Sequence, residues 1–328
     1  MTREMNLYPL CFKPIYRDYI WGGDRIIRTY GRNEPPGIYA ESWEISDRDD
    51  GMSLVRNGPL AGRSLRELVR MGGADLLGTR VRSPVFPLLI KLIDSRERLS
   101  VQVHPNDETA RRYGGEAKTE MWYMLDAAPD AGVFAGLKAG TDETAFNRAM
   151  ETKRFREILN RVPVKAGDAI FIPGGRVHAI DAGCLILEVQ QNSNTTYRIY
   201  DWDRVGNDGQ PRPLHLAEAR QVIDWTDAAG AKAHPRRIEK TGLNERWEIL
   251  ESPYFRLERL VLAEPWTARG DGSTFQVLFV ATGRVRVEAG GGIEVLEPGT
   301  SCLLPAALRE CVIRPVNSTA EVLRTTVP

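Results

Sequence analysis

The sequence has few cysteines, few histidines, no long apolar run and no net charge, and these shortages exclude several classes of protein. Four cysteines among 328 residues show neither CxxC spacing nor the density of a disulfide scaffold. We expect reduced, mostly buried thiols at Cys11, Cys184, Cys302 and Cys311. The 44 Lys and Arg residues equal the 44 Asp and Glu residues in number, so no net field recruits nucleic acid or an acidic membrane.

Apolar segments of membrane-spanning length are missing as well. No stretch approaches the roughly 18 apolar residues that a transmembrane helix needs. The opening residues, MTREMNLYPLCFKP, lack the continuous apolar region of a signal peptide. A hydrophobic content of 42% with 27% charged residues is ordinary for a soluble globular protein. We therefore expect a cytoplasmic protein, long enough for two domains, that binds neither membranes nor nucleic acids.

Of only four histidines, two stand beside other residue types that bind metals. In the segment LSVQVHPND, strand alternation places Ser100, Gln102 and His104 on one face. Glu120 opens the next apolar run, TEMWYML, and His178 follows a Pro-Gly-Gly turn in AIFIPGGRVHAI. Two imidazoles, a carboxylate and an amide oxygen, with no thiolate, suit a divalent metal such as zinc with one position left open. The alternative is a pair of ordinary polar histidines on a barrel rim.

Three basic residues stand in positions where a charge needs an explanation. Lys91 is the only charge in the apolar run from Val85 to Ile93, so it needs a buried carboxylate or an anionic ligand. Lys118 lies two residues before Glu120 and shares its face if the strand begins there. In the segment CLILEVQQNSNTTYR, strand alternation places Glu188 and Arg198 on the same polar face, unless the strand breaks near residue 193.

The rest of the chain predicts short strands with a few helices. A strand is expected in YAESWEIS, and a helix capped by Ser64 should end at Gly72 and Gly73. Asn106 or Asp107 can cap a short helix, DETARRY, inserted before Glu120. Two helices are expected between residues 141 and 162, and LAEARQVID predicts one more.

Two segments share a frame of Gly, five residues and Pro. They are GDAIFIP, from Gly167 to Pro173, and GTSCLLP, from Gly299 to Pro305. We interpret them as parts of a duplicated β-domain of the sandwich or jelly-roll type. The position that matches His178 is Glu310 in the second copy, so we expect that copy to bind no metal.

The motifs together resemble a known enzyme family. The segment from Gly167 to Asp181 is similar to the second cupin motif, and the first cupin motif departs from its usual form by having Gln102 in place of a His and a late Glu120. LSVQVHPND, AKTEMWYM, PGGRVHAI and QQNSNTTYRIYDWDR, in that order, resemble the short bacterial form of type I mannose-6-phosphate isomerase. The likeness extends to FKPIYRDYIWGG and AESWEIS, and it runs nearly end to end.

The resemblance implies a mainly β fold with two cupin domains and a few helices inserted in or flanking the first. The first domain, residues 1–235, would be catalytic, and the second, residues 236–328, a degenerate copy without metal. The family's single zinc would bind Gln102, His104, Glu120 and His178. Its catalytic Arg falls on Arg198, and its substrate pocket on Trp21, Glu41, Lys91, Lys118 and Glu188.

The implied reaction interconverts mannose 6-phosphate and fructose 6-phosphate through an enediolate. Glu188 is the candidate base, Arg198 would stabilise the enediolate, and Lys91 and Lys118 could hold the phosphate, or one of them could carry protons. One residue departs from the family: four positions before the Arg stands Asn194, which does not titrate, where an Asp is common. The alternatives are a sugar-phosphate-binding cupin without activity and a metal-dependent isomerase or epimerase of another sugar. We expect a monomer or a homodimer.

Overall fold

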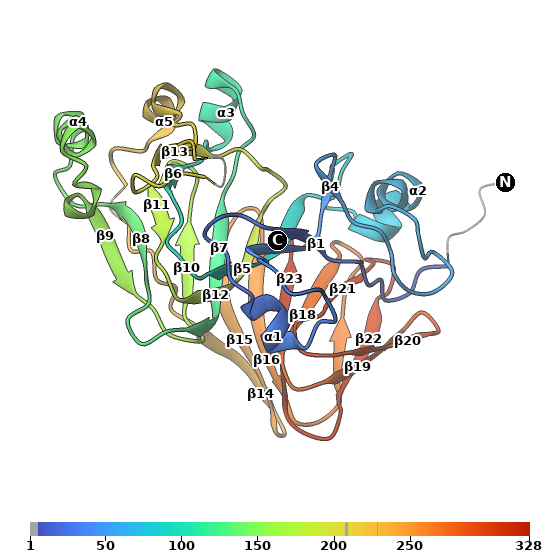
Figure 1. The fold of residues 1–328 in the computed structure, drawn as a ribbon. Coiled ribbons are helices and arrows are strands. Elements are labelled where there is room, and N and C mark those ends of the chain that lie inside the picture. Colours follow the sequence, from blue (N-terminus) through green and yellow to red (C-terminus); the bar gives the residue numbers. More distant parts are fainter. Residues whose placement is uncertain (1–5, 207–208, 228) are drawn as a thin grey trace. The chain divides into compact units, whose positions relative to one another are not determined.

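A computed structural model describes residues 6–206, 209–227 and 229–328 of the chain. It is built mainly from short antiparallel strands in four larger sheets and one two-stranded ribbon (Figure 1). The mainly β fold that the sequence predicts is therefore confirmed. Within the described residues, no helix combines the length and the apolar character that crossing a membrane would require.

Two sheets carry most of the residues predicted to matter for function. The first has six strands, in the order β1 (Ile15–Arg17), β2 (Glu41–Ile45), β5 (Leu88–Ser95), β12 (Cys184–Gln191), β7 (Glu120–Ala127) and β10 (Ala169–Ile172). The second has five, in the order β13 (Tyr197–Tyr200), β6 (Val101–Val103), β11 (His178–Ile180), β8 (Gly132–Leu137) and β9 (Leu159–Pro163).

The C-terminal residues form a second pair of sheets. Six strands follow the order β14 (Arg236–Thr241), β15 (Asn244–Glu251), β16 (Arg256–Leu262), β23 (Ala320–Thr326), β18 (Gln276–Thr282) and β21 (Ser301–Leu304). Four follow the order β17 (Trp266–Arg269), β22 (Glu310–Pro315), β19 (Val285–Ala289) and β20 (Gly292–Leu296). The ribbon pairs β3 (Asp47–Arg48) with β4 (Gly51–Met52).

The predicted duplication appears in these strand orders. The first Gly-x5-Pro segment contains β10, the last strand of its six-stranded sheet, and the second contains β21, the last strand of the other. In the first copy Glu120 pairs with Ile172, and His178 pairs with Gln102. At the matching registers of the second copy, Gln276 pairs with Leu304 and Glu310 with Arg269. In the second copy, Gln276 therefore stands at the position of Glu120, Glu310 at that of His178, and Arg269 at that of Gln102.

The helices after residue 60 begin where the sequence predicts, and one shorter helix, Arg25–Tyr30, was not predicted. They are α1 (Arg25–Tyr30), α2 (Leu65–Leu77), α3 (Asp107–Tyr113), α4 (Glu143–Thr152) and α5 (Leu216–Val222), with a 3₁₀ turn at Phe155–Glu157. Ser64 and Glu67 form a capping box on α2, and Asn106 caps α3. The expected end of α2 at Gly72 and Gly73 is wrong. Gly73 has a φ of 44° and interrupts the helix, which continues because Leu76 and Leu77 are buried.

A second helix predicted before residue 162 is also wrong. Only the 3₁₀ turn forms there, and β9 follows it, because the apolar Leu159 pairs across to Leu137 of β8. The helix insertion before Glu120 is confirmed as α3. In Figure 1, α3 and α5 lie side by side, and α5 packs on β6 and β13.

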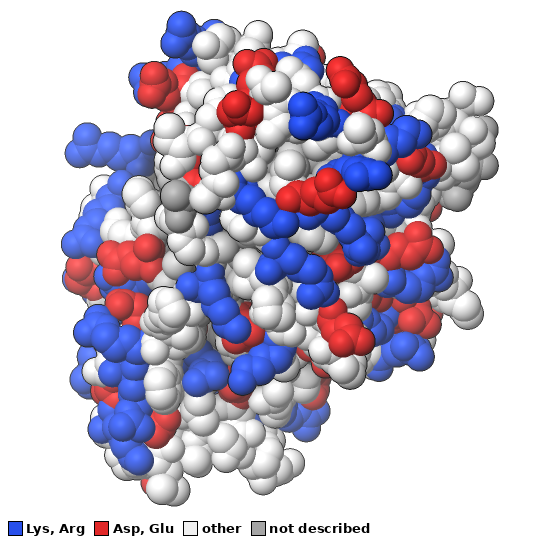
Figure 2. Space-filling model, turned by 90° about the vertical axis from the view of Figure 1, so that its left-hand side faces the viewer, with Lys and Arg blue, Asp and Glu red and all other residues white. Residues whose placement is uncertain are grey.

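The chain separates into two compact units, each with its own core. One comprises residues 1–15, 43–90 and 234–328, and its core includes three of the four free cysteines. The other comprises residues 16–42 and 91–233, and Trp122 and Phe134 are among the apolar residues of its two clusters. The predicted boundary of the cupin repeats at residues 235 and 236 is a different division and stays a prediction. Figure 2 shows acidic and basic side chains intermixed over one face, as equal numbers of both allow.

Candidate metal centre and substrate pocket

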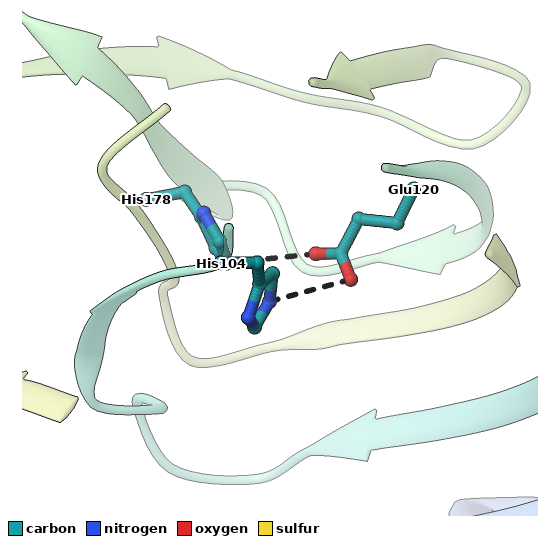
Figure 3. Close-up of side chains that lie close together, drawn as sticks. All are labelled: His104, Glu120 and His178. Carbon is teal, nitrogen blue, oxygen red and sulfur yellow. Dashed lines mark ion pairs between the residues drawn. The ribbon is translucent and has the colours of Figure 1, made fainter. Parts of the chain in front are cut away.

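Three of the four predicted ligands form a buried cluster inside the unit of residues 16–42 and 91–233. His104 directly follows β6, His178 opens β11 and Glu120 opens β7. One ligand atom from each lies within 4.8 Å of the others. Nε2 of His104 is 3.6 Å from Oε2 of Glu120, and Nε2 of His178 is 3.5 Å from Oε1 (Figure 3). Gln102, the fourth, places its amide nitrogen 3.2 Å from His178 Nε2.

The turn between β10 and β11 sets the position of His178 against His104. The amide N–H of Gly175 donates to the carbonyl oxygen of His104 at 2.8 Å, so the turn is bonded to one ligand while it leads into the other. Gly175 has a φ of 95°, which favours glycine. At Gly174 a Cβ atom would lie 2.7 Å from the backbone of Asn106. A side chain on Gly174 would therefore push the two ligand segments apart.

Both histidines of the cluster are neutral, so each has one unprotonated ring nitrogen. Burial lowers the pKa of His178 to about 3, and Nδ1 donates to the carbonyl oxygen of Arg176 at 2.8 Å. Burial, together with the nearby Lys118, lowers the pKa of His104 well below its ordinary value. The carbonyl fixes the tautomer of His178 so that Nε2, the atom facing Glu120, is unprotonated. Imidazoles bind metals in this form.

Glu120 is a buried carboxylate that needs a positive charge. It has no exposed surface, and burial raises its pKa to about 7 although Lys118 opposes the rise. Among the described residues, neither oxygen has a hydrogen bond of regular geometry, yet Lys118 Nζ lies 2.7 Å from Oε2. The same Nζ lies 3.2 Å from His104 Nε2. An ammonium thus stands against two of the three ligands, so the residues present fit a cation, and their N/O donors fit a divalent metal.

A cavity of about 290 Å³ adjoins this cluster. Its lining includes each substrate or catalytic residue predicted from the sequence: Trp21, Glu41, Lys91, Lys118, Glu188 and Arg198. Gln102 lines it as well, whereas His104, Glu120 and His178 do not. The structure therefore gathers these residues around one polar pocket. Their individual roles stay predictions.

Lys91 is held between two carboxylates at the pocket wall. Nζ is 3.2 Å from Glu188 and 3.5 Å from Glu41, and the lysine is 4% exposed. Burial alone would lower the pKa of Lys91, but the two acids raise it above its ordinary value. Burial would raise the pKa of Glu188, but Lys91 and Lys118 hold it low, and Trp122 Nε1 donates to Glu188 at 3.0 Å. Lys91 is thus both ion-paired and in the pocket, and it stays charged.

Arg198 reaches the pocket from a separate strand, because the strand breaks near residue 193, the alternative that the sequence left open. A continuous strand from Glu188 to Arg198 is wrong, because β12 ends at Gln191 and β13 joins the other sheet. Arg198 instead pairs with Gln102 across β13 and β6. Its Nη1 donates to the carbonyl oxygen of Pro213 at 2.8 Å.

Two more polar residues line the pocket, Arg212 and Asn194, and the sequence did not predict either of them as a pocket residue. Arg212 lines the cavity, and no motif singled it out. Its only signal in the sequence is a basic residue between two prolines. Its side chain is held at the pocket by hydrogen bonds to Asp201. Asn194 lines the same cavity, and its backbone N–H donates to Oε2 of Glu116 at 3.0 Å.

A β-sandwich with a buried cluster of two histidines and a glutamate beside a polar pocket defines a cupin-like protein with a candidate metal centre. The model of the family "Phosphomannose isomerase type I, catalytic domain" matches residues 10–132. The chain is 34% identical to the probable mannose-6-phosphate isomerase GmuF of Bacillus subtilis, over 93% of this chain and 96% of that one. It is 36% identical to the mannose-6-phosphate isomerase ManA of the same organism, with the same two shares. The chain therefore belongs to the type I mannose-6-phosphate isomerase family, a family of aldose–ketose isomerases, and is an enzyme of that family.

Solved structures agree with this assignment. The crystal structure of the mannose 6-phosphate isomerase from Bacillus subtilis has a TM-score of 0.88, with 29% identity over 97% of this chain and 99% of that one. A putative mannosephosphate isomerase from Archaeoglobus fulgidus has a TM-score of 0.76 at 22% identity, with shares of 97% and 96%, and shows the fold alone. The predicted resemblance is confirmed by these comparisons.

Proposed function

We propose that the protein interconverts mannose 6-phosphate and fructose 6-phosphate with one zinc ion per chain. The observation that carries this proposal is the buried cluster of His104, Glu120 and His178 beside a pocket that holds Lys118, Glu188 and Arg198. Family membership supports the substrate, since the curated relatives are named mannose-6-phosphate isomerases. Gln102 would supply the fourth ligand through its amide oxygen.

The reaction moves a proton between C1 and C2 of the sugar, so it needs a base and a way to stabilise the enediolate. Zinc, when bound, supplies a Lewis acid that polarises sugar oxygens. Glu188 is ionised and fixed by Trp122 and Lys91, so it can accept the proton. Arg198 stabilises the negative charge that develops on the enediolate. Trp21 and Glu41 shape the wall of the pocket, and Lys91 and Lys118 bind sugar oxygens.

Lys118 is the second candidate for moving protons. Its Nζ contacts both Glu120 and His104, so it stands between the cluster and the pocket. With Asn194 unable to titrate, the proton between the sugar oxygens must travel by Lys118, by Glu188 or by water.

Asn194 also favours a second candidate function, a sugar-phosphate-binding cupin without activity. A third is a metal-dependent isomerase or epimerase of a different sugar, because the hydroxyl configuration that the pocket accepts is not part of the motifs. The proposal further includes a cytoplasmic location, a monomer or homodimer, and no nucleic-acid or membrane partner.

The deciding experiment is an assay of the zinc-loaded protein with mannose 6-phosphate and, in the reverse direction, fructose 6-phosphate. We expect turnover in both directions and its loss after chelation and in Glu188→Gln. Binding of the sugar phosphate without turnover would establish the binding protein instead. Faster turnover of another hexose phosphate would change the substrate.

A further inference from the structure

We propose that a cavity of the C-terminal sheets binds a small oxyanion, a phosphate ester or a carboxylate metabolite, through Arg80, Arg324 and Gln276. The site belongs to the unit of residues 1–15, 43–90 and 234–328, and it shares no residue with the catalytic pocket. The inference is independent of the proposed function, because it concerns binding at a different site.

The second copy has a cavity at the place that corresponds to the catalytic pocket. Its lining includes Gln276 and Arg269, which stand at the positions of Glu120 and Gln102. The volume is about 440 Å³, which is within the range of small-molecule sites. The charged side chains of the lining are those of Arg80, Arg256, Arg269, Arg324, Glu251 and Asp271. The second copy therefore lacks the metal ligands, but the space beside their positions is open.

An ion pair at this cavity repeats the buried ion pair of the catalytic pocket with the charges exchanged. In the first copy, Glu188 pairs with the residue two positions after Glu120. In the second, Arg324 pairs with the residue two positions after Gln276, so it takes the place of Glu188. Its partner Glu258 comes from β16, which has the place of β5, the strand of the lysine in the first pair. A guanidinium thus lines the cavity where the catalytic pocket has a carboxylate, and Glu258 does not line it.

Arg324 is fixed in position and has donors to spare. Its Nε donates to Oε2 of Glu258 at 2.9 Å, Nη2 donates to the same oxygen, and Nη1 donates to Oε1 of Gln276 at 3.1 Å. Its Cζ lies 5.4 Å from the centre of the Trp266 ring. A guanidinium has five N–H donors, and these bonds use three of them. Burial lowers the pKa of Arg324 although Glu258 opposes the fall, so an anion in the cavity would stabilise the charged form.

Gln276 adds an amide donor. Because its Oε1 accepts from Arg324, its Nε2 is the atom left for a ligand. Gln276 is 6% exposed and lines the cavity, and no acceptor among the described residues is bonded to Nε2. A Cβ on Gly270, another residue of the lining, would lie 3.5 Å from this nitrogen. At the same position of the first copy, the ionised Glu120 offers only acceptors.

Arg80 is an arginine of the lining without a partner for its side chain. Its backbone N–H donates to the carbonyl oxygen of Ser273 at 3.0 Å, which ties residue 80 to the cavity wall. Its guanidinium forms no hydrogen bond or ion pair with a described residue. The pKa of Asp271 is lowered by hydrogen bonds from Ser273 and, to a smaller extent, by the charge of Arg80. The guanidinium is therefore available to a ligand.

The other charged groups of the lining already have partners. Arg256 donates to Glu251 at 2.7 Å, and Arg269 donates to Glu310 at 3.2 Å. Asp271 accepts a backbone N–H at 2.8 Å. The charged and amide groups that remain for a ligand are thus N–H donors, two of which belong to guanidinium groups. Such a set binds an oxyanion, and a guanidinium fits the oxygens of a phosphate and of a carboxylate alike.

The test is isothermal titration calorimetry of the whole zinc-loaded chain, with inorganic phosphate and succinate as separate probes. We expect Gln276→Glu to weaken binding of the anion on the order of 100-fold, because the new carboxylate takes the remaining donors of Arg324 and repels the ligand. Arg80→Ala should weaken it on the order of 10-fold, as the loss of a hydrogen bond from a charged group does. Any binding of the same anion in the catalytic pocket is common to all variants, so the difference from the wild type reports this cavity.

Arg70→Ala is the matched control. It removes an exposed guanidinium of the same unit that does not line the cavity, so we expect wild-type affinity. Arg80 is exposed too, so Arg80→Ala keeps the test valid if Gln276→Glu does not fold. Binding of one probe and not the other identifies the kind of oxyanion.

Three results would overturn the proposal. The first is a wild type that binds neither probe, and the second is wild-type affinity in both Arg80→Ala and Gln276→Glu. The third is an equal loss in Arg70→Ala and Arg80→Ala, which would show a diffuse effect of charge in place of a site.

Discussion

Arg198 and His215 form two reciprocal hydrogen bonds. The backbone N–H of Arg198 donates to Nδ1 of His215 at 3.0 Å, and the backbone N–H of His215 donates to the carbonyl oxygen of Arg198 at 2.7 Å. Burial and the charge of Arg198 lower the pKa of His215, which keeps Nδ1 free to accept. The start of α5 is thereby tied to the arginine proposed to act on the enediolate.

We predict that His215→Ala lowers kcat about 10-fold with a small change in KM, because it leaves the Arg198 N–H without an acceptor and frees β13. His215→Asn should restore most of kcat, since its side-chain oxygen can stand where Nδ1 stood. Steady-state kinetics at a fixed zinc content measure both. An asparagine variant as slow as the alanine variant would show that this hydrogen bond does not position Arg198.

Arg198 should act on the transition state more than on binding of the sugar ring. We expect Arg198→Ala to lower kcat by roughly 10²- to 10³-fold, as deletion of an oxyanion donor does, because the enediolate charge exists only in the transition state. Arg198→Lys should recover part of the loss. A stable, zinc-loaded Arg198→Ala protein with near-normal kcat would contradict the catalytic role.

The metal centre predicts one ion per chain. His104→Ala and His178→Ala should each lose most of the metal, measured by elemental analysis of dialysed protein. His215→Asn serves as the control, because it changes a histidine outside the cluster. Full zinc in both ligand variants would rule out this site. Two ions in the wild type would show that the second copy binds metal in spite of Arg269, Gln276 and Glu310.

Acid stability should depend on Asp181. Burial would raise the pKa of Asp181, but hydrogen bonds from Arg98 and Arg161 outweigh it, and the pKa lies below its ordinary value. Its contribution is therefore present above about pH 4, the unfolded pKa, and is lost as the pH falls through the lower folded pKa. We expect Asp181→Asn to be less stable at pH 7 and to lose stability less steeply below about pH 4.

Urea unfolding between pH 7 and pH 3 measures this difference. One proton sets its upper limit at about 1.4 kcal/mol per pH unit. Asp130→Asn is the control, since that side chain is exposed. Parallel pH profiles for the wild type and Asp181→Asn would show that the arginine cluster does not couple to folding.

The metal cluster could be predicted from the sequence because its signals are local. Strand alternation in LSVQVHPND predicts that Gln102 and His104 share a face, and the Pro-Gly-Gly turn marks the strand that begins at His178. The absence of a second helix before residue 162 could not be predicted, since Leu159 fits a helical pattern as well as a strand. Its pairing with β8 makes this segment a strand. Arg212 could not be found either. It reaches the pocket through its bonds to Asp201, eleven residues away, and nothing in local spacing encodes that contact.

The three clustered ligands belong to two sheets. His104 directly follows β6 and His178 opens β11 of the five-stranded sheet, and Glu120 opens β7 of the six-stranded sheet. An ion bound by all three would link the two sheets to each other. Resistance to heat and to proteases would then depend on the concentration of free zinc, through the mass action of a ligand that binds only the folded chain. In a cell short of zinc, the protein would lose durability along with activity.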